Sequence, residues 1–413
     1  MNNFSRSDIK LNIEDVSGKT KEVLNITNLS LKWVENNNFS SYDWWDIWGT
    51  SFGSWAKGMY FKAKIIGIPF VAILVLLDLI YPNFRKLFVK KRTFPICHAH
   101  LGMAYLNLYE KFSSEEYLKK SESFVPELLK MASPYAKDLG WGMKHQWMTI
   151  QGLVPVDTPC NTQTSYGYEF FSRLYEITNK DEYKVYLEKI AKHVANDFPE
   201  WQVDDDKLVC SYSTIDKRRV VNANSYRMYM LIDAGIRFNN EFYLKKGLDT
   251  MRYVISKQNN DGSWPYSEDQ DFVDCYHTCF VLKNLNKVRK ILGEEYKSLL
   301  DSVIDKGLKY YLKNLFDENK YPIPFAIQPR TTIFKYDSYD LAESIALLSE
   351  LDIEHELIEK LVQFSKNTFQ TKEGWFKFRI YKVLPIIGIP YMRYSNSAMI
   401  FALTKVLKVK FNG

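Results

Sequence analysis

The side chains best suited to proton chemistry stand where helices are expected to begin. A polar turn containing a glycine spans residues 258–264, and the apolar-periodic segment that follows opens with Tyr276 and His277. In a helix, both side chains would lie in the first turn, beside backbone N–H groups that lack an intrahelical partner. Histidine titrates near neutral pH, so this position favours acid–base chemistry.

The same arrangement recurs along the chain. A helix end, a short polar turn and a second helix start occur at 108–118, 174–183, 234–244 and 286–296. Aligning these copies, and extending the pattern toward the C-terminus, makes six positions equivalent. They are occupied by His98, Thr164, Asn224, His277, Asp340 and Asn396. Successive positions are 66, 60, 53, 63 and 56 residues apart, which indicates a solenoid or a closed ring of helix pairs.

Two layers of helices would hold these positions in place. We predict first helices at roughly 98–111, 164–177, 224–238, 277–292, 340–351 and 396–409, and second helices near 115–132, 181–196, 241–258, 296–314 and 354–369. Because no polar capping repeat follows the sixth copy, we predict closure into an all-α (α/α)6 toroid. A helix near 23–36 would pair with the last helix. Strand signals are confined to short pieces such as 208–213. The toroid would form one domain, residues 21–413, after a flexible N-terminus at 1–20; an open α-solenoid that binds a protein is the alternative.

In such a ring the first helices line the inside, and the loops before them gather at one mouth. Catalytic roles are predicted for His98, Tyr276, His277 and Asp340. Substrate contacts are predicted for His100, Asp157, Tyr166, Asn222, Asn224, Tyr226, Trp264, Arg330, Tyr339, Arg393 and Asn396. For Thr164, Asn224 and Asn396 the alternative is a capping role, because these residue types favour helix N-termini, whereas histidine does not.

Two kinds of chemistry fit these residues. A histidine or tyrosine could remove a proton alpha to a carboxylate while an arginine holds that carboxylate and an asparagine polarises it. Glycoside hydrolysis by two carboxyl groups is the other reading, with Asp340 paired to Asp157, Asp274 or Asp337. The sequence does not decide between proton removal alpha to a carboxylate and glycoside hydrolysis.

Composition narrows the class of protein. The net charge of +6 over 413 residues is too small to indicate nucleic-acid binding. Five cysteines without a C-x-x-C pair argue against a disulfide framework, and no cofactor is predicted. Residues 1–21 contain no apolar run, so we expect no signal peptide and a cytoplasmic location.

The most hydrophobic stretch of the chain spans residues 65–81 and has lysines and arginines on both sides. It contains Pro69 and Asp78 and is short for a membrane-spanning helix, which needs about 20 apolar residues. We predict a buried helix here. The alternatives are a spanning helix and a peripheral contact of residues 62–92 with an anionic membrane at its inner face.

The hairpin repeat, the Asp261-Gly-Ser-Trp264 turn and the aromatic-acidic loop at 42–48 resemble the six-hairpin glycosidase-like superfamily, most closely surface-polysaccharide biosynthesis proteins of the VpsJ type. This resemblance covers most of the chain. It implies a bacterial carbohydrate-active or glycan-binding protein that takes a glycan or glycan-lipid in making capsule, exopolysaccharide or lipopolysaccharide. Relatives include hydrolases, lyases and uronyl epimerases. A non-catalytic, membrane-associated assembly factor is the alternative.

A second resemblance concerns residues 274–280, Asp-Cys-Tyr-His-Thr-Cys-Phe, which are similar to the zinc-histidine helix of protein prenyltransferase β subunits. In that family an aspartate and a cysteine ligand precede the histidine by one repeat. The corresponding residues here, 221–226, offer neither. Zinc requires about four ligands, so we predict no metal site, and a prenyltransferase-like zinc protein is the least favoured reading.

Overall fold

The computed structural model describes residues 18–329, 332–382 and 388–409. Six inner helices pack side by side in sequence order, and the last contacts the first, which closes the ring. They are α4 (Pro95–Phe112), α7 (Asn161–Thr178), α9 (Val221–Arg237), α11 (Cys275–Ile291), α13 (Ser338–Leu351) and α15 (Ala398–Val406). The predicted (α/α)6 toroid and its first helices are therefore confirmed.

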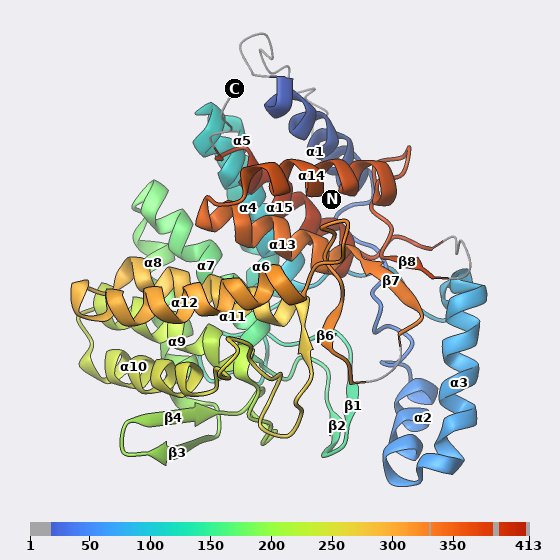
Figure 1. The fold of residues 1–413 in the computed structure, drawn as a ribbon, viewed down its shortest axis with the longest axis horizontal. Helices are drawn as coiled ribbons and strands as arrows, with labels where there is room; N and C mark the ends of the chain where they lie inside the picture. Colours follow the sequence, from blue (N-terminus) through green and yellow to red (C-terminus); the bar gives the residue numbers. More distant parts are fainter. Residues whose placement is uncertain (1–17, 330–331, 383–387, 410–413) are drawn as a thin grey trace.

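An outer layer of helices packs on this ring, each element against the inner helix that it accompanies in the repeat. The layer consists of α5 (Glu115–Glu122), α6 (Phe124–Lys130), α8 (Asp181–Asn196), α10 (Glu241–Ser256), α12 (Glu294–Asn314), α14 (His355–Phe364) and α1 (Gly18–Asn36). Figure 1 shows these hairpins following one another from cyan to red. As predicted, α1 packs on α15 and supplies the sixth outer helix. Residues 1–17 of the predicted flexible N-terminus lie outside the described residues, whereas 18–20 are helical.

The two layers differ in how their side chains are distributed. Outer helices bury one stripe, as in α8, where Tyr183, Leu187, Ile190 and Val194 face the inner layer. Inner helices are buried nearly all round, because they contact two neighbouring inner helices as well as the outer layer. Both layers contribute to one continuous hydrophobic core.

Four short antiparallel sheets accompany the segments that lead into the inner helices. They pair β1 (Trp147–Thr149) with β2 (Gly152–Val154), β3 (Glu200–Asp204) with β4 (Lys207–Cys210), β5 (Val273–Asp274) with β6 (Phe325–Ile327), and β7 (Phe334–Asp337) with β8 (Arg379–Tyr381). The predicted strand near 208 is β4. Because β5 and β7 run directly into α11 and α13, they fix the first residues of those helices.

Two further helices, α2 (Ser51–Lys62) and α3 (Lys64–Ile80), form a hairpin outside the ring, and the 3-10 segment η2 (Pro82–Leu87) follows them. Gly67 permits the tight turn, since a Cβ there would lie 2.2 Å from the Tyr60 nitrogen. The prediction of a buried helix at 65–81 is wrong. Only Gly67, Leu74 and Asp78 of α3 are buried, because α3 packs against α2 and η2 and not against the ring. No helix among the described residues is long and apolar enough to cross a membrane.

Two π-helical segments, η3 (Ser365–Phe369) and η4 (Met392–Ser397), continue α14 and precede α15. Deep inside the ring, charged side chains of the inner helices pair with one another. Lys283 bonds Glu343, Lys287 lies 2.6 Å from Glu169, and Lys405 lies 2.7 Å from Glu350. These ion pairs occupy the centre of the toroid below the ends at which the inner helices begin.

Candidate active site

A cavity of about 580 Å³ opens where the inner helices begin. Its wall is mainly aromatic and combines residues from the helix ends with residues from the preceding loops. The aromatic lining residues are Trp45, Tyr60, Trp147, Tyr166, Tyr212, Tyr226, Tyr266, Phe272, Tyr276, Phe280, Phe325, Tyr339 and Tyr394. Flat aromatic faces with polar groups between them suit a ring-shaped ligand that has both apolar and hydroxyl surfaces.

The cavity wall carries a histidine held by an aspartate. Asp274 is the N-cap of α11: its Oδ1 accepts from the His277 backbone N–H at 3.2 Å, and its Oδ2 lies 2.7 Å from His277 Nδ1. Asp274 is 3% exposed, and its backbone is fixed by the β5–β6 pairing. The ring of His277 remains 18% exposed, between Tyr266 and Tyr276 with centroids 4.7 and 4.1 Å away. With Nδ1 bound to the carboxylate, Nε2 is the nitrogen available to a ligand.

An arginine stands in the same cavity. Arg218 contacts Asp216 through Nε at 3.1 Å and Nη2 at 2.7 Å, and its guanidinium lies 4.6 Å from the Tyr212 ring centroid. Burial opposes the charge of Arg218, but Asp216 together with Tyr266 and Tyr212 outweighs it, so the pKa of the guanidinium is raised. The side chain is 22% exposed, and a guanidinium has five N–H donors. Arg218 is therefore placed to bind an anionic group of a ligand.

The remaining wall holds tyrosines that stay protonated. The Tyr166 and Tyr226 hydroxyls are 2.9 Å apart, and Tyr276 and Tyr339 stand on neighbouring helices with ring centroids 5.2 Å apart. Burial raises the pKa of all four phenols well above the usual value. These tyrosines can donate hydrogen bonds. The described part of the wall has two histidines, His277 and His145; His145 is buried, and burial lowers its pKa to about 3, so His277 is the better candidate for the base.

Seven of the predicted site residues line this cavity. They are Tyr166, Asn222, Tyr226, Tyr276, His277, Tyr339 and Arg393. Arg393 is engaged differently from the prediction: its Nε and Nη2 each lie 2.8 Å from a carboxylate oxygen of Asp43. Asp43 belongs to the aromatic-acidic loop, so Arg393 anchors that loop instead of standing ready for a substrate carboxylate.

Two predicted histidines are buried away from the cavity. The His98 ring packs against Phe124 of α6 at 5.4 Å, so it faces the outer layer. Burial lowers the pKa of His98 to about 4, and neither ring nitrogen has a hydrogen-bond partner among the described residues. His100 is stacked on Phe401 at 5.1 Å, and burial lowers its pKa well below the usual value. The structure thus corrects the catalytic placement of His98 and the substrate contact of His100.

Asp340 does not line the cavity either. It is 2% exposed, and burial, followed by nearby Cys275, raises the pKa of its carboxyl well above the usual value. Asp157 pairs with Lys144 at 2.6 Å, and Asp337 caps α13 and binds Arg379 at 2.7 Å. Asp274 is the sole carboxylate among the described lining residues, so the predicted carboxyl pairs for hydrolysis do not meet in this cavity.

Three of the equivalent positions hold the preceding loop instead of a ligand. Asn224 bonds both backbone groups of Cys210 at 2.9 and 3.0 Å, and Asn396 accepts from the Phe376 N–H at 2.9 Å. Thr164 accepts from the Trp141 N–H at 3.1 Å in the same way. The predicted substrate contacts of Asn224 and Asn396 are wrong, and a structural role, though not a helix N-cap, replaces them.

Trp264 is also structural. Its indole N–H donates to the Val254 carbonyl at 3.1 Å, and Gly307 leaves room for its ring between α10 and α12. The preceding turn requires Gly262, whose φ is +99°. The last predicted contact, Arg330, lies outside the described residues.

Sequence reasoning missed Arg218, Asp216, Tyr212 and Tyr266. They lie in loops, where no helical period singles out a residue. One signal was present: an aspartate three residues before a histidine, directly before a helix, is the spacing of an N-cap, and it pairs Asp274 with His277.

The cysteines of the zinc-like segment point elsewhere. Cys275 and Cys279 lie 3.6 and 3.3 Å from the Tyr311 hydroxyl, in the core between α11, α12 and α13. Among the described residues, no three His, Cys, Asp or Glu side chains converge as metal ligands would. His277 and the two cysteines therefore form no ligand set.

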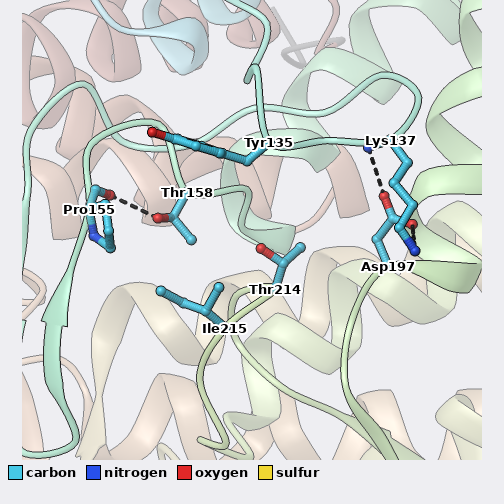
Figure 2. A pocket seen from close by; sticks show the side chains of 7 residues that line it. All are labelled: Tyr135, Lys137, Pro155, Thr158, Asp197, Thr214 and Ile215. Carbon is cyan, nitrogen blue, oxygen red and sulfur yellow. Dashed lines mark hydrogen bonds and ion pairs between the residues drawn. The ribbon is translucent and has the colours of Figure 1, made fainter.

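A second hollow, of about 420 Å³, lies outside the ring (Figure 2). Its charged residues, Lys137 and Asp197, bond each other, and Asp197 also holds His193 at 2.6 Å. Tyr135 and Ile215 are exposed at its edge. Because both charges are already paired, the hollow offers no acid–base group comparable with His277.

No protein-family model matches the sequence, and no curated protein matches it. Solved structures do share the fold. An unsaturated glucuronyl hydrolase specific for heparin superposes with a TM-score of 0.59 at 10% identity, covering 94% of this chain and 97% of that chain. The family 76 α-mannanase of Bacteroides thetaiotaomicron gives 0.57 at 10% identity over 76% and 86% of the two chains. A sugar epimerase from a ruminal bacterium gives 0.56 at 10% identity over 76% and 87%. The likeness is one of fold.

Proposed function

We propose that this protein is a carbohydrate-active enzyme in which His277 moves a proton to or from a sugar bound in the aromatic cavity. The observation that carries the proposal is the Asp274–His277 pair, with Nδ1 held at 2.7 Å and the ring exposed to the cavity. A buried carboxylate fixes the tautomer in which Nε2 is unprotonated, and it stabilises the imidazolium formed when Nε2 accepts a proton.

Proton transfer at carbon fits the cavity better than hydrolysis by two carboxyl groups. Arg218 would bind the carboxylate of a uronate, and its charge would stabilise the enolate formed when Nε2 removes the alpha proton. Donation of a proton to the opposite face by a protonated tyrosine of the wall would epimerise the sugar, after which Nε2 releases its proton and the tyrosine regains one from solvent. Departure of the oxygen at the beta carbon, with that C–O bond breaking as the C=C bond forms and the oxygen taking a proton from a tyrosine of the wall, would instead cleave the glycan as a lyase does. Hydrolysis would need a second carboxyl group, and the described lining residues provide only Asp274.

We also propose the pathway in which the protein acts. An α-mannanase, a polysaccharide lyase and a sugar epimerase that share this fold support a glycan substrate. The resemblance to the VpsJ type supports a role in bacterial capsule, exopolysaccharide or lipopolysaccharide biosynthesis. We place the protein at the inner face of the membrane, because α3 exposes an apolar surface next to basic residues.

Incubation with uronate-containing oligosaccharides in D2O tests this function. An epimerase would place deuterium on carbon, and a lyase would form an unsaturated product; mass spectrometry detects both. We expect His277→Ala to abolish either product while His355→Ala, at a half-buried histidine on α14 outside the cavity, keeps it. Hydrolysed products without deuterium or unsaturation, or full turnover by His277→Ala, would refute the assignment.

A non-catalytic assembly factor is the second candidate, and the exposed surface of α3 favours it. Complementation of a deletion strain distinguishes the enzyme from the assembly factor. If the protein only docks partners, a His277→Ala gene will restore polysaccharide production in a deletion strain as well as the unaltered gene does. If the protein is an enzyme, that variant will fail although it accumulates to the same level.

A further inference from the structure

The hairpin of α2 and α3 exposes more apolar side chains than any other part of the described chain. On α3, Ile65 is 87% and Ile80 is 76% exposed, and the end of η2 adds Leu87 at 81%. Other large exposed side chains of this surface are Phe52, Trp55, Phe61, Ile66, Ile68, Ile73, Leu76, Leu77, Tyr81 and Phe88. Soluble proteins rarely expose contiguous apolar patches beyond a few hundred Å², so this surface requires a partner.

The charges around this apolar surface indicate which kind of partner covers it. Between residues 47 and 109 the chain carries eight basic residues and one acidic residue, Asp78. Asp78 is buried and bonded to Arg85, so it adds no negative charge to the surface. Lys62, Lys64, Lys86 and Lys90 are exposed and form no ion pair with a described residue. Apolar side chains beside lysines match an anionic bilayer, whereas two copies of this hairpin would repel each other.

The α2–α3 hairpin forms part of the cavity wall close to the turn between its two helices. Tyr60 of α2 lines the cavity, and α2 packs against β1 and β2, where Trp147 lines it too. Figure 1 shows α2 and α3 projecting beside this β-hairpin. The β1–β2 turn adds Ile150, which is 78% exposed, to the apolar surface. A bilayer that covers the hairpin would therefore lie next to the cavity that holds His277.

The hairpin is also fixed to the cavity floor. Arg85, which follows α3, donates to the Asp43 carbonyl at 2.7 Å, and the Asp43 carboxylate binds Arg393 of the cavity. This chain of contacts is buried throughout, since Arg85 and Asp43 are 0% exposed and Arg393 is 3% exposed. The distance between the membrane surface and the cavity is thus set by packed side chains and not by a flexible linker.

We infer that the α2–α3 hairpin docks on an anionic lipid bilayer and that the substrate of the adjacent cavity is a glycan attached to a membrane lipid. The substrate half rests on the proposed function, because it assumes that the cavity processes a glycan. The lipid part of the substrate stays in the bilayer under the hairpin, and the sugar reaches His277 from the mouth. Docking itself requires no catalysis.

Vesicle flotation tests the docking half with the full chain. We expect it to float with phosphatidylcholine–phosphatidylglycerol vesicles and at least tenfold less with phosphatidylcholine alone, with binding weakening as salt rises. Ile65→Glu/Ile80→Glu should lower flotation at least tenfold. The control Val185→Glu/Leu299→Glu adds the same charge at two outer helices where each residue is 46% exposed, and it should float normally.

Three results would overturn docking. The unaltered chain could remain unbound at low salt, or the control could lose flotation as fully as the hairpin variant. Alternatively, sedimentation could reveal a dimer that Ile65→Glu/Ile80→Glu dissolves, in which case a second copy covers the surface. His277→Ala should float normally, so failure of docking and failure of catalysis are measured separately.

Turnover measurements test the second part of the inference, that the substrate is a glycan attached to a membrane lipid. One uronate oligosaccharide is supplied free and coupled to a diacyl anchor in the anionic vesicles. We expect the anchored form to react at least tenfold faster, and Ile65→Glu/Ile80→Glu to remove that advantage while turnover of the free form stays unchanged. Equal rates on both forms would overturn the lipid-linked substrate but leave the proposed function standing. No reaction with either form, despite flotation, would overturn the substrate half together with the proposed function.

Discussion

The replacement Asp274→Asn separates the two tasks of this residue, which are to cap α11 and to hold the His277 ring. Asparagine caps helices as well as aspartate does, so its Oδ1 can still accept from the His277 backbone N–H. The side-chain amide would then face Nδ1 with an N–H, which forces Nδ1 to accept and moves the ring proton to Nε2. We expect the folded protein to persist and the base to be lost.

The size of each effect follows from these contacts. Capping is retained, so the free energy of unfolding should change by less than about 1 kcal/mol. The wrong tautomer, together with loss of the charge that stabilises the imidazolium, should lower kcat by about 10² to 10⁴, or about 3–5 kcal/mol. The matched control is Asp337→Asn, which alters the N-cap of α13 outside the cavity lining and should keep turnover per folded molecule.

Two measurements check this reasoning. Turnover of the uronate oligosaccharide gives kcat, and long-range proton–nitrogen NMR of His277 shows which ring nitrogen carries the proton. We expect Nδ1–H in the unaltered protein and Nε2–H in Asp274→Asn. A neutral His277 that already carries its proton on Nε2 would refute the argument, as would a variant that retains kcat within threefold.

Three further replacements have defined outcomes. Arg218→Met should raise KM for an anionic sugar about ten- to a hundredfold with a smaller effect on a neutral sugar, because a charge-assisted contact of about 1.5–3 kcal/mol is lost; steady-state kinetics on both sugars measures this. Asp340→Asn should leave kcat within threefold, since Asp340 lies outside the cavity lining and burial raises the pKa of its carboxyl; a large loss would restore Asp340 to the mechanism. His98 has a folded pKa of about 4 against an ordinary 6.5, so the unfolded chain binds the extra proton and stability falls as pH drops through this window, by up to about 3 kcal/mol. Urea unfolding at several pH values should show a weaker acid dependence for His98→Leu.

The repeated helix pairs, with no polar capping repeat among them, predicted the ring. Each helix pair repeats an amphipathic outer helix and an apolar inner helix, and this pattern does not depend on loop structure. The prediction failed where burial depends on packing between segments that are far apart in the sequence. The apolar character of 65–81 is compatible with burial, but a helix is buried only if something covers it, and among the described elements α3 packs mainly against α2 and η2. The short sheets were mostly missed because their strands are two to five residues long.

The site was predicted in part, and the helical register explains which part. Thr164 and Asn224 are the fourth residues of α7 and α9, and this position faces the preceding loop. His277 is the third residue of α11, so the alignment that equated it with them was displaced by one residue. Successive residues of an α-helix are rotated by about 100°. A displacement of one residue therefore moves a side chain from the face that bonds the preceding loop to the face that lines the cavity. The sequence repeat alone could not reveal that displacement.

The stripe that faces the centre of the ring begins at the second residue of an inner helix. In α11 it runs through Tyr276 and Phe280, which line the cavity, and continues with Lys283 and Lys287, at the spacing of one helix face. Glu343 and Glu169 of facing helices pair with these lysines. Breaking a buried ion pair costs free energy. These paired side chains therefore keep the centre of the ring filled below the aromatic residues that line the cavity. With the centre of the ring filled in this way, a ligand bound beside His277 would enter from the mouth, next to the C-terminal end of α2.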